Sequence, residues 1–127
     1  MPEPNPAKKK ILVVDDEPLV CEAIGMMLSF DGHEVITAGS GKEALDLFDR
    51  GGFDLVTTDY TMPEMKGDEL ARALKVRLPG QPVIMITAHA EMFKNDVVAM
   101  SGVDQVVSKP FKLQELRDAI QKATARR

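Results

Sequence analysis

Short runs of apolar residues alternate along this chain with longer stretches in which apolar residues recur at the spacing of a helix. A short run that is apolar throughout is typical of a strand buried on both faces, because such a strand has no side left for solvent. Strands are predicted on this basis at residues 11–14 and 83–87, and the alternation along the chain predicts further strands at 34–38, 53–58 and 103–107.

The stretches that follow these strands predict five helices, whose ends are marked by Pro, Ser, Asp and Gly. Pro18 suits the first turn of a helix, where its missing N–H costs nothing. Ser40 and Asp68 suit helix N-termini, where a side-chain oxygen accepts a backbone N–H. Five strands alternating with five helices predict an α/β fold, a doubly wound parallel sheet with helices on both faces. The predicted helices extend from Pro18 to Asp31-Gly32, from Ser40 to Gly51-Gly52, from Asp68 to Pro79-Gly80, from Phe93 to Met100, and from beyond Pro110 to Ala123.

Length and composition indicate one globular domain. The 127 residues are 44% hydrophobic and 28% charged, a balance that excludes a disordered chain. The net charge of -4 argues against a general nucleic-acid or membrane-surface binder. A single cysteine, Cys21, excludes an internal disulfide, and no apolar run approaches the ~18 residues of a membrane span. Since the first apolar run is also too short for a signal peptide, we expect a cytoplasmic protein.

Residues able to do chemistry follow directly after the predicted strands. The first strand is followed by Asp15 and Asp16, the third by Asp59, and the fifth by Ser108 and then Lys109, while the fourth ends at Thr87. In a sheet of this kind the ligand site lies beyond the carboxyl ends of the strands. If the first and third strands are neighbours, three carboxylates converge on one small volume.

Converging carboxylates repel one another unless a positive charge lies among them. A divalent cation with oxygen ligands would relieve this repulsion, and Mg²⁺ is the abundant one. The sequence has no His or Cys cluster, which argues against zinc. Lys109 adds an ammonium group and Thr87 a hydroxyl donor. A carboxylate surrounded by a metal, an ammonium and a hydroxyl is equipped to accept a phosphoryl group.

These residues resemble the receiver domain of two-component response regulators, and the resemblance extends from about Lys9 to Thr124. Each short motif alone is a weak signal, but together, on the expected elements, they are strong. The motifs are Val13-Val14-Asp15-Asp16-Glu17-Pro18, Asp59-Tyr60-Thr61-Met62-Pro63, Thr87-Ala88 and Lys109-Pro110.

The resemblance implies a role for each of these side chains. Asp59 would be the phosphoacceptor, taking the group from a histidine of a sensor kinase or a phosphotransfer protein. Asp16, Asp59 and the backbone carbonyl of Thr61 would bind Mg²⁺ directly, and Asp15 would act largely through water. Thr87 and Lys109 would contact the phosphoryl group. The family also implies a flavodoxin-like sheet order of 2-1-3-4-5 and a cis peptide bond before Pro110.

On this resemblance, residues 9–124 form the receiver domain, with tails at 1–8 and 125–127. The domain would be a signalling switch and not a turnover enzyme. Phosphorylation would alter a surface formed by the fourth helix, the fifth strand and the fifth helix, which would bind an unknown downstream protein. No direct contact with nucleic acid or membrane is expected. The start at Met and the end about one turn past the last helical pattern favour a stand-alone receiver.

Two positions depart from the family pattern. The family usually has an aromatic residue three positions before the lysine of the fifth strand, where this chain has Val106. The loop after Pro63 usually has Asp or Asn before its glycine, where this chain has Lys66. Neither departure removes a residue needed for phosphorylation, but the usual coupling of the threonine to an aromatic ring is absent.

Other interpretations of the same residues remain open from sequence alone. A Mg²⁺-dependent phosphohydrolase with an aspartyl nucleophile pairs its first Asp with another two residues later, and Asp15 is followed at that distance by Glu17. A flavin or dinucleotide binder lacks support, because no Gly-rich or Ser/Thr-rich phosphate loop follows the first strand. His33 and His89 have no second ligand at metal spacing, so we expect each to be exposed or singly hydrogen-bonded. Cys21 is expected to be a structural thiol, since no base accompanies it.

Overall fold

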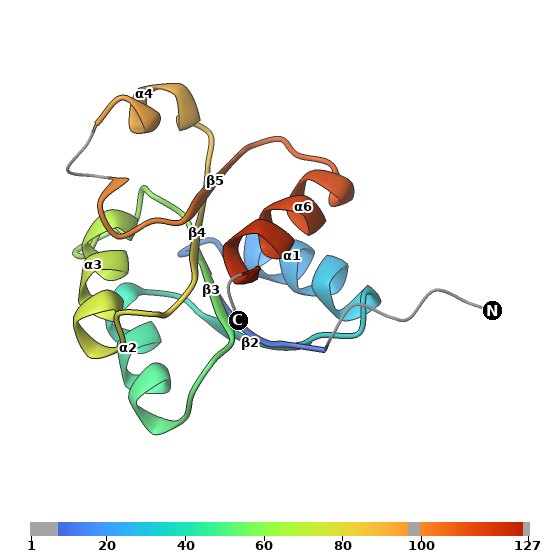
Figure 1. The fold of residues 1–127 in the computed structure, drawn as a ribbon, viewed down its shortest axis with the longest axis horizontal. Coiled ribbons are helices and arrows are strands. Elements are labelled where there is room, and N and C mark those ends of the chain that lie inside the picture. The colour runs from blue at the N-terminus through green and yellow to red at the C-terminus, as the bar shows by residue number, and fades with distance from the viewer. Residues whose placement is uncertain (1–7, 97–99, 126–127) are drawn as a thin grey trace.

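The computed structural model describes residues 8–96 and 100–125, which form one five-stranded parallel sheet with helices on both faces (Figure 1). The strands lie in the order β2-β1-β3-β4-β5, so the predicted fold class and the implied order are both confirmed. The elements are β1 (Lys10–Val14), α1 (Pro18–Phe30), β2 (Glu34–Ala38), α2 (Gly41–Arg50), β3 (Leu55–Thr58), α3 (Gly67–Arg77), β4 (Val83–Thr87), α4 (Ala90–Lys94), β5 (Gln105–Ser108) and α6 (Leu113–Thr124).

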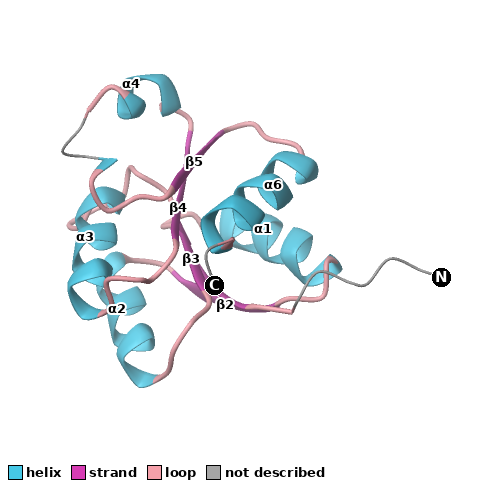
Figure 2. Cartoon of the chain, viewed as in Figure 1, coloured by secondary structure: helices cyan, strands magenta, loops and turns pink. Residues whose placement is uncertain are grey.

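Successive side chains of each strand point to opposite faces of the sheet and so form two separate apolar layers. α1 and α6 cover one face of the sheet, and α2 and α3 cover the other (Figure 2). In β1, Ile11 and Val13 pack on the first layer, whereas Leu12 and Val14 pack on the second. Because all four side chains are at most 1% exposed, this strand must be apolar throughout, as the sequence pattern indicated. Among the described residues, no helix is both long and apolar enough to cross a membrane.

Three predicted helix ends are confirmed at atomic detail. Pro18 occupies the first turn of α1. The Ser40 hydroxyl oxygen accepts the backbone N–H of Glu43 at 3.1 Å and so caps α2. α1 ends at Phe30 with Asp31 as its C-cap, and Gly32 follows with a φ of 91°, a conformation that side chains disfavour.

Strand boundaries differ from the prediction because two apolar residues lie outside the ladder. β3 begins at Leu55 and not at 53, since Phe53 leaves the ladder to stack on Phe48 at a ring distance of 6.4 Å. β5 spans Gln105–Ser108 and not 103–107, because the N–H of Val103 closes a turn onto the Met100 carbonyl. β1 gains one residue at its start.

Two helix starts were predicted wrongly. Asp68 does not cap α3, which begins at Gly67, and its buried carboxylate instead pairs with Arg72 one turn later at 3.0 Å. α4 begins at Ala90, earlier than the predicted Phe93, because the N–H of His89 turns onto the Thr87 hydroxyl and Ala90 is buried directly after it. Residues 97–99 of that predicted helix lie outside the described residues, as do residues 1–7 and 126–127 of the two predicted tails.

The loop between β3 and α3 contains a strained turn and a close backbone contact. Glu64 has a φ of 70°, and the N–H of Met65 bonds the Pro63 carbonyl across it at 2.7 Å, which is the pattern of the rare γ-turn with positive φ. The loop ends where the Gly67 N–H bonds the Tyr60 carbonyl at 2.9 Å. A Cβ at Gly67 would overlap the backbone carbonyl of Asp59.

We therefore expect Gly67→Ala to destabilise the protein by about 1–3 kcal/mol, the usual cost of forcing extra volume into a packed site. The loss should appear although Ala has the better helix propensity. Gly52→Ala is the matched control, because a Cβ there meets no atom within 4 Å. Urea unfolding monitored by circular dichroism measures both variants. Equal stabilities for the two variants would contradict the close contact.

Candidate functional site

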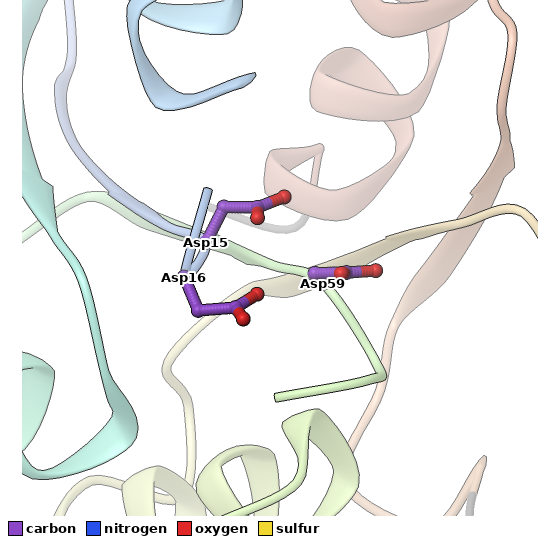
Figure 3. Close-up of side chains that lie close together, drawn as sticks. All are labelled: Asp15, Asp16 and Asp59. Carbon is purple, nitrogen blue, oxygen red and sulfur yellow. The ribbon is translucent and has the colours of Figure 1, made fainter. Parts of the chain in front are cut away.

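Three carboxylates meet at the carboxyl ends of β1 and β3 (Figure 3). Asp15, Asp16 and Asp59 each offer an oxygen, and these oxygens all lie within 4.8 Å of one another. Their burial differs: Asp15 is 2% exposed, Asp59 is half-buried and Asp16 is exposed. Solvent therefore reaches the cluster from the Asp16 side.

The strand ladder brings these residues together. β1 and β3 are parallel neighbours with Val14 opposite Thr58, so the next residues in each chain segment must also be adjacent. The pairing continues one step past the strands, because the Asp59 N–H bonds the Val14 carbonyl and the Asp15 N–H bonds the Ala38 carbonyl, both at 3.1 Å. The condition stated for convergence, that the first and third strands are neighbours, is met.

Local backbone donors orient two of the three carboxylates. Asp15 Oδ1 accepts the N–H of Glu17 at 2.9 Å, and Asp59 Oδ1 accepts the N–H of Tyr60 at 2.8 Å. Hydrogen bonds to a carboxylate favour its charged form and hold its orientation. The two groups are thus fixed by their own loops before any ligand binds.

Lys109 reaches this cluster from β5. Its Nζ lies 3.3 Å from Asp15 Oδ2 and 3.6 Å from Asp59 Oδ1. Its backbone N–H bonds the Thr87 carbonyl at 2.9 Å, which continues the β4–β5 ladder beyond Ser108. The Lys109–Pro110 peptide bond is cis, as the resemblance implied.

Within the described part of the chain, the other two predicted site residues, Thr87 and Thr61, make no hydrogen bond to the acidic cluster. Thr87 is buried at the end of β4, and its hydroxyl oxygen accepts the N–H of His89 at 3.1 Å within its own loop. Thr61 is exposed two residues after Asp59. Their roles toward a phosphoryl group and a metal stay predictions.

The charges of the cluster oppose one another. The pKa of Asp59 is raised, chiefly because burial removes water from its carboxylate; the Lys109 ammonium lowers it and the Asp15 charge raises it further. One ammonium therefore does not fully compensate the carboxylates. The donor set is composed of oxygen atoms, partly buried and crowded, and it fits a hard divalent cation such as Mg²⁺.

Cys21 and the two histidines have the surroundings expected from the sequence. The Cys21 thiol donates to the Asp15 carbonyl at 3.2 Å, and burial raises its pKa, so it is a poor nucleophile. His33 is buried, accepts the Lys9 N–H on Nδ1 at 3.1 Å, and has a pKa lowered by burial. His89 is exposed.

Two neighbours of the site were not singled out from the sequence. Gly67 abuts the Asp59 backbone, and the only available signal was a glycine directly before a helical pattern. Tyr60 donates its N–H to the Asp59 carboxylate. It is the only tyrosine of the chain and directly follows Asp59, which could have drawn attention to it.

Comparison with known proteins gives a consistent result. Residues 11–121 match the family described as the response regulator receiver domain. The chain is 35% identical over 106 residues to the probable transcriptional regulatory protein TcrX of Mycobacterium tuberculosis, covering 84% of this chain and 45% of TcrX. It is 36% identical over 113 residues to the transcriptional regulatory protein GlrR of Escherichia coli, covering 89% of this chain and 26% of GlrR. The chain thus spans less than half the length of these relatives.

Solved structures agree with the fold. The receiver domain protein from Clostridium thermocellum has a TM-score of 0.84 and 38% identity, covering 92% of this chain and 94% of that one. TrrA from Thermotoga maritima, in complex with Mg(2+)-BeF, has a TM-score of 0.85 and 36% identity, covering 91% and 98%. With the family match over most of its length and the strand order and strand-end residues described above, this chain belongs to the response regulator receiver domains of two-component systems.

Proposed function

We propose that this domain accepts a phosphoryl group on Asp59 from a histidine of a sensor kinase or a phosphotransfer protein, in a Mg²⁺-dependent reaction in the cytoplasm. The modification then alters the surface offered to a downstream protein. The observation that supports this most is the position of the Lys109 ammonium, which lies against Asp15 and Asp59 beside a third carboxylate. This combination provides a nucleophile together with counter-charge for a transferred phosphoryl group.

The chain's own residues divide the reaction among them. An Asp59 carboxylate oxygen attacks phosphorus, a phosphorus–oxygen bond forms, and the bond from phosphorus to the donor imidazole nitrogen breaks. The Lys109 ammonium is close enough to follow the new negative charge, and the Thr87 hydroxyl would donate to a phosphoryl oxygen. The product is an acyl phosphate that later hydrolyses, so the domain is modified once per transfer and does not act as a turnover enzyme.

The acidic cluster would hold the cation. Asp16, Asp59 and the Thr61 carbonyl would bind Mg²⁺ directly, with Asp15 acting through water. When bound, Mg²⁺ supplies positive charge to the oxygens of the transferred group. Support comes from the chemistry of the donor set and from the similar TrrA structure, which is a complex with Mg(2+)-BeF.

The phosphohydrolase alternative is not favoured. It would place the nucleophile at Asp15, which is 2% exposed and whose two oxygens already contact the Glu17 N–H and the Lys109 ammonium. Asp59 is more accessible and therefore the better acceptor. We also assign no nucleic-acid contact to this domain, whose net charge is -4; the match covers only 45% and 26% of the two relatives named as transcriptional regulators.

A protein donor is supported by the outer side of α1. Leu19, Met26 and Phe30 are 78%, 67% and 79% exposed, and their spacing places them on one side of the helix. Exposed apolar stripes of this kind mark binding surfaces. The stripe begins three residues after Asp16, so a protein that presents a phosphohistidine to Asp59 can cover both.

Asp59→Asn should abolish Mg²⁺-dependent labelling by acetyl phosphate, because the amide is not a nucleophile toward phosphorus. Intact mass spectrometry with and without Mg²⁺ measures the modification. Asp118→Asn, at an exposed position on α6, is the matched control and should label like wild type. Full labelling of Asp59→Asn would falsify the choice of acceptor.

Asp59→Asn should also make the metal-free protein more stable at pH 7. The folded-state pKa of Asp59 is raised, so ionised Asp59 destabilises the fold, and that cost appears as pH rises through the folded-state pKa. Adding Mg²⁺ at a hundred times its Kd should stabilise wild type by about 2.7 kcal/mol and the variant by less. Urea unfolding from pH 3.5 to 8 tests both effects. A variant less stable than wild type at pH 7 without metal would refute the electrostatic account.

Met26→Glu and Phe30→Glu should each slow phosphotransfer from a sensor kinase by about tenfold, the effect of losing one buried contact residue. The kinase is first identified by screening sensor kinases for phosphotransfer to the wild-type domain. Labelling by acetyl phosphate should be unchanged, since the small donor needs no docking surface. Val76→Glu replaces an apolar residue that is 82% exposed on α3 and serves as control. Equal slowing by all three variants would show that surface charge and not the α1 stripe is responsible.

A further inference from the structure

The two departures from the family pattern, Lys66 and Val106, contact one pair of packed side chains: Lys66 lies over Tyr60, and Val106 packs on Met85. The Tyr60 ring packs on buried Met85 together with Val103 and Val106. The Lys66 Nζ lies over the same ring, 5.8 Å from its centroid. The ring that the family usually places on the fifth strand is missing here, and a ring from the acceptor loop packs on Met85, as Val106 also does.

Tyr60 is also tied to the acceptor through its backbone. Its N–H donates to Asp59 Oδ1 at 2.8 Å, and its carbonyl accepts the Gly67 N–H at 2.9 Å, at the start of α3. A change in the charge or orientation of the Asp59 carboxylate thus acts directly on the hydrogen bond of Tyr60. The fixed start of α3 limits how far the backbone can shift, which directs the adjustment toward the ring.

The contact of the Tyr60 ring with Met85 lies next to the edge strand of the sheet. Met85 of β4 is paired with Val106 of β5, and β5 is the last strand in the sheet order. Val106 is half-buried and packs against Met85, on which Tyr60 also packs, so this cluster forms part of the cover of the edge. A packed cluster of this type has discrete arrangements and transmits a displacement.

We infer that Tyr60 is a positioning residue that links the state of Asp59 to the edge strand β5, through its N–H at one end and, at the other, its packing on Met85, the ladder partner of Val106. This inference rests on the proposed function, because it needs Asp59 to change charge. Lys66 contributes through its ammonium, which lies over the Tyr60 ring. Signalling to β5 therefore requires no aromatic residue at position 106.

The test uses the full chain with Mg²⁺ and beryllium fluoride, a stable mimic of the phosphoryl group. Wild type contains one tyrosine and no tryptophan, so its intrinsic emission reports on Tyr60 alone and should change at the concentration that saturates binding. Hydrogen exchange of the peptide containing Gln105–Ser108, followed by mass spectrometry, should change on binding in wild type. Hydrogen exchange is unaffected by ring currents, so removal of the Tyr60 ring does not by itself alter the measured exchange.

Tyr60→Phe keeps the ring and should retain the exchange response of β5. Tyr60→Ala keeps the backbone N–H, so it should still bind beryllium fluoride, measured by calorimetry, but lose that response. Phe53→Ala is the matched control, since it removes a core ring before β3, at the opposite end of the sheet, and should retain the response. If Tyr60→Ala does not fold, Tyr60→Leu takes its place and should lose at least half of the response.

The outcomes separate the two claims. A Tyr60→Ala protein, or its Leu replacement, that binds the mimic and shows the wild-type β5 response overturns the role of Tyr60 and leaves the proposed function standing. Wild-type protein that binds no Mg²⁺ and beryllium fluoride overturns the proposed function, and the inference with it.

Discussion

The repulsion among three carboxylates is the constraint on which this site depends. Parallel pairing of β1 with β3 forces Asp15 and Asp59 together whatever their charges, because each directly follows a paired strand. The only partial compensation described at the cluster comes from Lys109, whose strand is separated from β3 by β4. A long flexible side chain with a compact ammonium suits that reach better than a rigid guanidinium. Folding thus brings together carboxylates whose negative charges repel one another, and this repulsion favours the binding of a cation.

The stability that holds these charges together comes from elsewhere in the molecule. Two apolar layers, on opposite faces of the sheet, bury β1, β3 and β4 almost completely. Such burial contributes on the order of 1.5–3 kcal/mol for each large side chain. Fixed strands therefore impose the positions of the residues at their carboxyl ends. Because the two apolar layers stabilise the fold, the negative charges of the acidic cluster can be only partly neutralised without unfolding the domain.

The sequence was sufficient for the strands and for the strand-end residues, and for a physical reason. A fully buried strand such as β4 is composed mainly of apolar residues, and the residue after a paired strand has its location fixed by the ladder, as with Asp59 after β3. Boundaries failed where packing outside the ladder used the same residue types: Phe53 is apolar because it stacks on Phe48. Asp68 is a residue type that often caps helices, but here its carboxylate forms an ion pair with Arg72. The packing of Tyr60 on Met85 could not be predicted, because the two residues are distant in sequence.

The loop from Asp59 to Gly67 combines two properties that a switch needs. It is anchored at both ends, by the Asp59 N–H on the Val14 carbonyl and by the Gly67 N–H on the Tyr60 carbonyl. Between these anchors, Glu64 adopts a left-handed conformation that costs a residue with a side chain on the order of 1–3 kcal/mol. Relief of that strain can offset part of the cost of rearranging the loop when Asp59 changes charge. If Asp59 is phosphorylated as proposed, these anchors would confine the rearrangement to the side chains nearest to it, Tyr60 among them.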